Sequence, residues 1–415
     1  MPKVLFVSDY ACETGFATVS KNIVSELKRH FKGDLKMDII ANNYFGEAYD
    51  EDENIFVAPA KINDVKLDDY GRHFFLSALK NSNEYDILFI ISDLGVVVPI
   101  IEILESIKKE KREKNMKSFK SMYYFPMDCH GFPQILKGLE FFDVLVTYTE
   151  FGRNEILKVR PELRSKLKVI NHGTNINDFY PLEPSDVFKF RNEFFGDVCD
   201  KFIISNINRN QPRKDIPTTI FAFIEAKENW NLAYPKPFLY LHMHPRDPMG
   251  WDLRAIFWQL DLVEGEDYKL LPDEWIDNMP PAATVNNILN ASDAYLTTTL
   301  AEGWGLVISE AMAAKTPVIC PLNTSLTEMT DIGKRAITYE TFYPVINTTD
   351  QIIRQQGNIE DVAACILKLA DMRYDSTKVS FLDAANMLNN AYQWATNLTW
   401  HELSKRWIEY IKLLS

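Results

Sequence analysis

The chain has 415 residues, of which 46% are hydrophobic and 25% charged, and its formal net charge at pH 7 is −13. This length exceeds what one hydrophobic core supports and predicts two domains of an ordinary soluble protein. The negative charge argues against a nucleic-acid-binding protein, because binding to the phosphate backbone depends on lysine and arginine.

In the first half, short β-rich apolar runs alternate with amphipathic stretches. This alternation predicts an α/β fold in which helices cover a parallel sheet. The stretch "YPLEPSDVF" follows, and we expect a hinge there, near residues 181–190. The predicted strands are 3–8, 36–41, 85–91, 121–126, 143–148 and 166–170, with helical runs over 19–30 and 99–109.

The second half restarts the pattern and predicts a second doubly wound domain. We expect a first domain over 1–183 and a second over 190–385. Such sheets bind ligands outside the carboxyl ends of their strands. In the tail, Thr399 and Glu402 form a capping box, and the apolar residues after them share one helix face. The predicted strands are 201–207, 238–243, 268–271, 294–299, 317–320 and 335–340.

The cysteine pattern and the start of the chain both predict a cytoplasmic location. The five cysteines are scattered without a C-x-x-C pair, as in reduced thiols. The strand-like run "KVLFVS" follows Met1 and Pro2 directly, so we expect no signal peptide. No apolar run reaches the roughly 18 residues that a transmembrane helix needs.

The stretch "LAEGWGLVISEAMAAKTPVI" (300–319) places two glutamates around a glycine-rich turn and the start of a helix. The free N–H groups of that helix, beside Gly303 and Gly305, form a site for a phosphate or a sugar oxygen. Glu302 and Glu310 would lie about 12 Å apart along the helix axis. This spacing suits a nucleotide sugar, which has hydroxyls at both ends and a diphosphate between them.

Several stretches resemble retaining GT-B glycosyltransferases of family 4. "EGWGLVISEAMAAKTPVI" is similar to the E-x7-E signature, and "NINRNQPRKD" is similar to the family's GR…KG element. "INHGTNINDFYPL" and the first loop, "DYACETGFATVS", resemble family elements less specifically. The resemblance is strongest over 200–330. It implies two Rossmann-like domains facing across a cleft, with a C-terminal crossover helix over about 386–415.

The resemblance implies a role for each motif residue in glycosyl transfer with retained configuration. Arg209 and Lys214 would bind the donor diphosphate and stabilise the charge that grows as the glycosyl–phosphate bond breaks. Glu302 would bind hydroxyls of the donor sugar and Glu310 the ribose. His130, at the end of "YYFPMDCHG", would contact the sugar from the first domain.

Further donor contacts follow from the same resemblance. The glycine of the first loop would let a backbone N–H approach the donor phosphate, and the segment 269–273 would contact the base. Trp304 stands where the family usually has Phe, which bears on fit rather than on reaction class. These expected donor-binding residues are Gly15, Leu271, Gly303, Trp304, Gly305 and Leu306.

The sequence says less about donor identity, cofactors and partners than about the motif residues. The residues do not separate guanine from uracil; resemblance to mannosyl-transferring members favours GDP-mannose, with UDP-sugars second. We expect no metal or other cofactor, because two cations and a helix terminus suffice electrostatically. The only literal D-x-D, Asp50-Glu51-Asp52, is typical of a solvated loop. The acceptor would be a hydroxyl of a glycan, glycoprotein or glycolipid.

Two further questions stay open from the sequence. The basic run 108–120 is more typical of a solvated helix end, but it leaves a peripheral membrane contact open. The chain resembles family members encoded by large DNA viruses, and in that interpretation the host cytosol would suit its reduced cysteines. Other readings are a sugar-nucleotide epimerase or phosphorylase of the same fold, and a sugar-nucleotide binding protein without activity.

Overall fold

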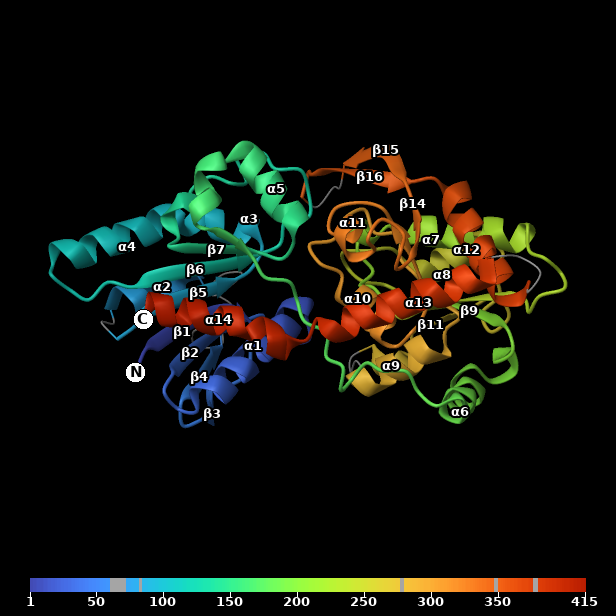
Figure 1. Cartoon of the computed structure of the whole chain (residues 1–415), viewed down its shortest axis with the longest axis horizontal. Coiled ribbons are helices and arrows are strands. Elements are labelled where there is room, and N and C mark those ends of the chain that lie inside the picture. The colour runs from blue at the N-terminus through green and yellow to red at the C-terminus, as the bar shows by residue number, and fades with distance from the viewer. Residues whose placement is uncertain (60–71, 82–83, 277–279, 347–349, 376–379) are drawn as a thin grey trace. The chain divides into compact units, whose positions relative to one another are not determined.

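The computed structural model describes residues 1–59, 72–81, 84–276, 280–346, 350–375 and 380–415. Contacts divide the chain into two compact units. Unit 1 comprises Met1–Gly173 and Trp400–Ser415, and unit 2 comprises Thr174–Thr399. Each unit is an α/β layer structure, with its sheet between helices (Figure 1).

The sheet of unit 1 has the strand order β3-β4-β2-β1-β5-β6-β7-β8. Every neighbouring pair is parallel except β3 and β4. The central strands are buried on both faces, as helix-covered parallel strands must be. The strands are β1 (Lys3–Asp9), β2 (Lys36–Asn42), β3 (Tyr49–Asp52), β4 (Ile55–Pro59), β5 (Ile87–Ile91), β6 (Lys120–Phe125), β7 (Val144–Thr147) and β8 (Leu167–Val169).

The C-terminal helix completes the helical cover of unit 1. α14 (Trp400–Leu414) packs beside α1 (Gly15–Phe31), as Figure 1 also shows. Its apolar face is buried, and Trp407 contacts the rings of Phe89 and Tyr124. The other helices are α2 (Arg72–Asn81), α3 (Leu94–Val97), η1 (Val98–Ile100), α4 (Ile101–Glu113), η2 (Leu139–Phe141), α5 (Glu150–Val159) and η3 (Pro161–Ser165).

The main sheet of unit 2 has the strand order β11-β10-β9-β12-β13-β14 and is parallel throughout. In chain order this is 3-2-1-4-5-6, the order of a dinucleotide-binding fold, whose switch point lies between β9 and β12. A separate antiparallel pair joins β15 to β16. The strands are β9 (Phe202–Asn206), β10 (Pro237–Leu241), β11 (Tyr268–Leu270), β12 (Ala294–Leu296), β13 (Val318–Pro321), β14 (Ile337–Tyr339), β15 (Thr341–Ile346) and β16 (Ile353–Gly357).

Helices cover both faces of this sheet and bury one contiguous apolar core between α7, α12 and the strands. The longest, α13, packs against α10 (Figure 1). The helices are α6 (Pro184–Phe195), η4 (Gly196–Val198), η5 (Pro212–Lys214), α7 (Ile216–Glu228), α8 (Leu253–Gln259), η6 (Asp273–Trp275), α9 (Ala282–Ala291), α10 (Leu306–Ala313), α11 (Leu326–Met329), α12 (Ile359–Tyr374) and α13 (Ser380–Asn397).

The unit boundaries differ from those expected from the sequence. Residues 174–183 lie in unit 2, because backbone N–H groups of Tyr180 and Leu182 donate to Asn286 and Asn290 of α9. The expected hinge at 181–190 therefore overlaps α6. The expected single helix over 386–415 is two helices, α13 and α14, and only α14 belongs to unit 1. The helical conformation is interrupted between α13 and α14, where the Thr174 N–H donates to the Leu398 carbonyl.

The acidic run at 50–52 is largely exposed, as expected, but it is a strand and not a loop. It forms β3, an antiparallel edge strand on β4. The Tyr10 hydroxyl donates to Glu51 over 2.6 Å, and Asp52 pairs with Lys28 over 2.5 Å. Glu51 and Asp52 therefore have partners within unit 1, which the sequence pattern around them did not reveal.

Candidate functional site

The switch point of the unit 2 sheet brings together polar residues that follow β9 and β12. Asn208, after β9, donates to the hydroxyls of Tyr295 and Thr297 at 3.4 and 3.2 Å. The segment after β12 is tied to the start of α7, because the Thr298 hydroxyl donates to the Asp215 carbonyl at 2.8 Å. These contacts fix the edge of the sheet at which a doubly wound fold binds its ligands.

Glu302 lies at this edge in a buried ion cluster. Its carboxylate contacts the Lys214 ammonium directly, and Arg213 Nη1 lies 3.3 Å from Glu302 Oε2. Burial raises the pKa of Glu302, but the charges of Lys214 and Arg213 outweigh it and lower this pKa to about 2. The side chains of Glu302 and Lys214 are only 10% and 13% exposed. The Glu302 carboxylate is therefore ionised at neutral pH inside a site of limited solvent access.

The glycine-rich turn after Glu302 leads directly into α10. Gly305 precedes the helix with φ +111°, a conformation that favours glycine. Among the described residues, no acceptor is found for the N–H groups of Gly303, Gly305, Leu306 and Val307. A helix N-terminus with open amides attracts an anion. The predicted start of this helix near Gly305 is confirmed.

Side chains from the loop after β13 hold this turn in place. The Ser325 hydroxyl donates to the carbonyls of Glu302 and Trp304 at 2.8 and 2.9 Å. The Thr324 hydroxyl accepts from Glu302 N–H at 3.0 Å, and the Asn323 amide donates to the Leu300 carbonyl at 3.1 Å. Three consecutive polar side chains thus hold the backbone of the turn.

Glu310 lies within α10 and is half-buried. Burial, with a smaller contribution from the charge of Asp178, raises the pKa of Glu310 to about 8. No hydrogen bond or ion pair to its carboxylate is found within the described part of the chain. Burial raises the pKa of Tyr295, and the charges of Glu302 and Glu310 raise it further. Both acids therefore lie within electrostatic reach of one hydroxyl.

Arg209 and Lys214 differ in their surroundings. The Arg209 guanidinium donates to Asp247 over 2.9 Å, and its side chain is 60% exposed. Burial raises the pKa of Asp247, but its hydrogen bond with Arg209 helps to bring it below the usual value. Arg209 is therefore an exposed side chain held by the buried carboxylate of Asp247, whereas Lys214 is fixed inside by Glu302.

The other expected donor-binding residues of unit 2 fall into two groups. Gly303 and Leu306 are partly exposed in the turn, close to the open amides. Trp304 and Leu271 are buried, with 4% and 2% of their surfaces exposed. Trp304 stacks on Trp394 of α13, with ring centroids 6.0 Å apart. The side chain of Trp304 therefore supports the turn instead of facing solvent.

Two expected site residues, Gly15 and His130, belong to unit 1. Gly15 is the exposed first residue of α1, and the Thr14 hydroxyl caps that helix by accepting from Ala17 N–H at 3.1 Å. His130 is largely exposed, and its Nδ1 lies 3.1 Å from Glu155 of α5. Their roles toward a donor stay predictions.

Sequence reasoning missed several residues of this edge. Arg213 precedes Lys214 directly, and that adjacency was an available signal for a second buried cation. Asn208, Asp247 and Ser325 carried no comparable signal, because their roles depend on segments far apart in the chain.

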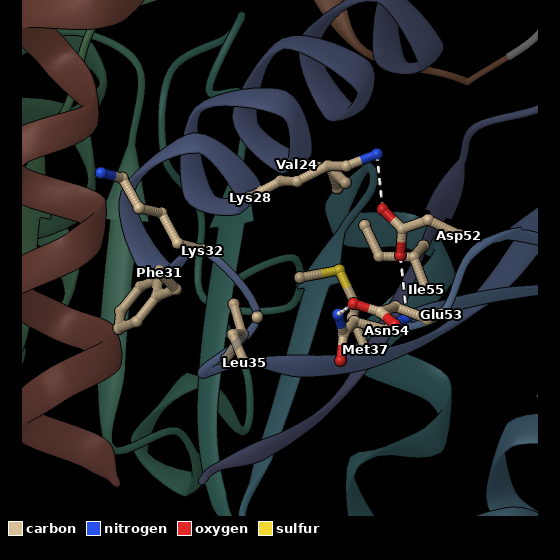
Figure 2. A pocket seen from close by; sticks show the side chains of 11 residues that line it. Val24, Lys28, Phe31, Lys32, Leu35, Met37, Asp52, Glu53, Asn54 and Ile55 are labelled. Carbon is tan, nitrogen blue, oxygen red and sulfur yellow. Dashed lines mark hydrogen bonds and ion pairs between the residues drawn. The ribbon is translucent and has the colours of Figure 1, made fainter.

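A cavity of about 230 Å³ in unit 1 lies elsewhere, at the amino ends of β2 and β4 (Figure 2). Val24, Leu35 and Met37 line it, with the Lys28–Asp52 pair at one side. This is the end of the sheet opposite to the carboxyl ends at which ligands bind.

No group of three or more His, Cys, Asp or Glu side chains that could hold a metal ion occurs among the described residues. Within the same residues, no helix combines the length and the apolar character needed to span a bilayer.

The fold and the edge described above are those of a two-domain α/β protein with parallel Rossmann-like sheets, as in GT-B glycosyltransferases. Residues 274–373 match the family described as "Glycosyl transferases group 1". The segment includes Glu302, the turn and Glu310. These matches support a glycosyltransferase of the GT-B fold.

One curated relative is a probable sucrose-phosphate synthase from Thermosipho melanesiensis, 28% identical over 186 residues, which are 45% of this chain and 39% of the relative. Among solved structures, HepE of Anabaena in complex with UDP and glucose has a TM-score of 0.67 and 16% identity. That likeness covers 99% of this chain and 100% of HepE. Sucrose-phosphate synthase from Thermosynechococcus elongatus has a TM-score of 0.66 and 13% identity, over 100% and 98% of the two chains.

Proposed function

We propose that the protein is a retaining glycosyltransferase of family 4, which moves a sugar from a nucleotide diphosphate sugar to an acceptor hydroxyl. One observation carries the proposal: a buried carboxylate, Glu302, held by Lys214 and Arg213 beside a turn with open amides, at the switch point of the sheet. The site thus offers an acceptor of hydroxyl hydrogen bonds next to donors for an anion.

The proposed chemistry places the donor diphosphate against Lys214 and the amides of the turn. As the glycosyl–phosphate bond breaks, negative charge grows on the departing oxygens, and preorganised cations and amides stabilise that charge. Glu302 accepts hydrogen bonds from the sugar hydroxyls, and Glu310 binds the ribose diol. Arg209 contacts the diphosphate from the rim after exchanging its Asp247 partner.

Reaction with retention on one face needs no side-chain nucleophile, because the departing phosphate accepts the proton of the acceptor hydroxyl. We propose that this chemistry proceeds without a metal ion, since Lys214, Arg213, Arg209 and the amides supply the opposing charge. The test is turnover in EDTA and in added Mg²⁺, with the anomeric configuration of the product read by NMR. Equal rates and a retained anomer are expected; strict metal dependence or inversion contradicts this part.

The identity of the donor's base is proposed from the compared proteins and not from site residues. GDP-mannose, the expectation from the sequence, finds no counterpart among the proteins compared above. HepE was solved in complex with UDP-glucose. We therefore rank UDP-sugars first and GDP-mannose second.

A panel of nucleotides tests the proposed function directly. Thermal unfolding is measured with UDP-glucose, GDP-mannose, ADP-glucose and their nucleoside diphosphates, followed by turnover with the best donor. Stabilisation by one base series, with release of its nucleoside diphosphate in the presence of a sugar acceptor, is expected. A flat response across all three bases contradicts the proposal.

The alternative of a sugar-nucleotide binding protein without activity predicts a different result. It would show the same stabilisation by donor but no release of nucleoside diphosphate with any acceptor or with water. The Glu302 cluster fits both alternatives, so release of the nucleoside diphosphate decides between them.

A further inference from the structure

Trp394 of helix α13 packs against the glycine-rich turn through the side chain of Trp304. Trp394 stacks on Trp304, with ring centroids 6.0 Å apart and an interplanar angle of 27°. Trp304 lies between the two glycines and is only 4% exposed. Glycine gives a chain no stiffness of its own. The geometry of this turn therefore depends on what packs against the one large side chain within it.

Trp394 is itself held from a second direction. The Arg335 guanidinium carbon lies 5.0 Å from the centroid of the Trp394 ring, within the range of a cation–π contact. Arg335 also donates to the carbonyl of Met329 at 2.9 Å, at the end of α11. Burial lowers the pKa of Arg335, although the charge of Asp331 opposes this.

These contacts connect the backbone of the turn to the side chain of Trp304 through α11, Arg335 and Trp394. α11 begins beside Ser325, whose hydroxyl donates to the carbonyls of Glu302 and Trp304. Arg335 follows α11 in the chain and contacts the ring of Trp394. Trp394 in turn stacks on Trp304. The turn is thus fixed at its backbone by Ser325 and at its side chain by Trp394. The N–H groups of Gly303, Gly305 and Leu306 find no acceptor among the described residues.

We propose that Trp394 is a positioning residue that acts through Trp304 to hold the turn amides in place for the donor diphosphate. The inference rests on the proposed function and assigns to α13, outside the motifs that the sequence singled out, a part in diphosphate recognition. Trp394 touches neither substrate nor reacting atoms in this scheme. Its removal should therefore weaken binding of the phosphate part of the donor more than binding of the nucleoside part.

The experiment measures dissociation constants by calorimetry for UDP or GDP, whichever binds the wild type more tightly, and for the matching nucleoside. The variants are Trp394→Leu and the conservative Trp394→Phe. Loss of one aromatic pair should weaken diphosphate binding by about three- to tenfold. Nucleoside binding should change less than twofold, and Trp394→Phe should restore most of the loss. Trp258→Leu, a Trp that is 80% exposed on α8, is the matched control.

A double-mutant cycle separates positioning from a general loss of structure. If Trp394 acts through Trp304, adding Trp394→Leu to Trp304→Leu should weaken diphosphate binding no further. Trp304→Leu alone keeps the test available if Trp394→Leu fails to fold, because it should reproduce the same selective loss. Equal losses for diphosphate and nucleoside, or additive losses in the cycle, overturn the inference alone. No diphosphate binding by the wild type overturns the proposed function, and the inference falls with it.

Discussion

Glu302 is the residue on which the account depends most. Its carboxylate contacts Lys214 and Arg213, and their charges hold its pKa at about 2 against the effect of burial. Because its folded pKa is below its ordinary value, its contribution to stability is present above about pH 4.5 and is lost as the pH falls toward 2. At physiological pH the Glu302 carboxylate is therefore ionised.

Replacing Glu302 by Gln should separate turnover from binding. We expect the rate of sugar transfer to fall by about two to three orders of magnitude, the scale reported for loss of one preorganised transition-state contact. Affinity for the nucleoside diphosphate should hold or rise, because Lys214 and Arg213 lose a competing anion. Initial rates and calorimetric titration on the same preparation measure both. Parallel loss of rate and affinity would falsify this division of roles.

Glu310 should make stability fall as the pH rises. Its folded pKa of about 8 lies above its ordinary value of 4.5, so the folded state keeps a proton that the unfolded chain loses. The free energy of unfolding should therefore decrease between pH 4.5 and 8, by at most about 1.4 kcal/mol per pH unit from this group. Denaturant unfolding of wild type and Glu310→Gln across that range measures it. An identical slope in both proteins contradicts the assignment.

At this scale the sequence singled out residues more readily than the contacts between them. The two glutamates were found from their order around the turn, and Lys214 from the resemblance to the family's GR…KG element. The charges of both acids raise the pKa of Tyr295. The Lys214–Glu302 pair was not predicted, because a sequence does not say which charges meet across 88 residues. Trp304 was expected at the donor, whereas its ring packs on Trp394.

At the scale of elements, the turn before α10 depends on Gly305. Gly305 has φ +111°, which strains any residue with a Cβ. A Cβ added there would lie 3.2 Å from Ile308 Cδ1 and 3.4 Å from Leu326 Cδ2. Most of the turn's own hydrogen bonds come from residues 323–325, so its shape has little tolerance for a shifted backbone.

Gly305→Ala should destabilise the protein by about 1–2 kcal/mol from the left-handed conformation alone. It should also weaken nucleoside diphosphate binding, because the shifted turn moves the open amides. Gly265→Ala is the matched control: its φ is +82° and no atom lies within 4 Å of the added Cβ, so it should lose stability only. Equal diphosphate affinity in the two variants argues against an amide site at the turn.

β1, β2 and β5 through β14 were predicted within a few residues, because burial on both faces leaves a continuous apolar signal. β4 (Ile55–Pro59) was not predicted. β3 was missed since its sequence, "YDED", is acidic and stands at a sheet edge. The pair β15 and β16 was missed for a related reason: Phe342, Tyr343, Ile346 and Ile353 are exposed there and follow no helix-covered pattern.

At the scale of the whole molecule, α14 belongs to the first unit although it lies at the end of the chain. Its amphipathic face was evident in the sequence, but the surface that it covers was implied only by resemblance. Trp407 is 1% exposed and meets Tyr124 with ring centroids 4.6 Å apart. The unit boundaries at 173/174 and 399/400 depend on long-range hydrogen bonds, which no local pattern announces.

Trp407→Ala should destabilise unit 1 by about 3–5 kcal/mol, whereas Trp407→Phe should cost about 1.5 kcal/mol or less. Hydrogen exchange followed by mass spectrometry reads the effect unit by unit. In the Ala variant, protection should fall in β5 and β6, which carry Phe89 and Tyr124, and stay unchanged in β9 and β12. Equal loss in both sheets contradicts the division into separately stabilised units.

The central claim is that Lys214 and the open amides receive a diphosphate at the switch point of unit 2. Calorimetric titration of the wild type and Lys214→Met with a nucleoside diphosphate and the matching monophosphate tests it most directly. Lys227→Met, which breaks a Lys–Asp pair elsewhere in the same unit, is the control. The wild type and the control should bind the diphosphate at least about tenfold more tightly than the monophosphate, and Lys214→Met should lose that preference. A wild type without the preference, or a Lys214→Met variant that keeps it, contradicts the claim.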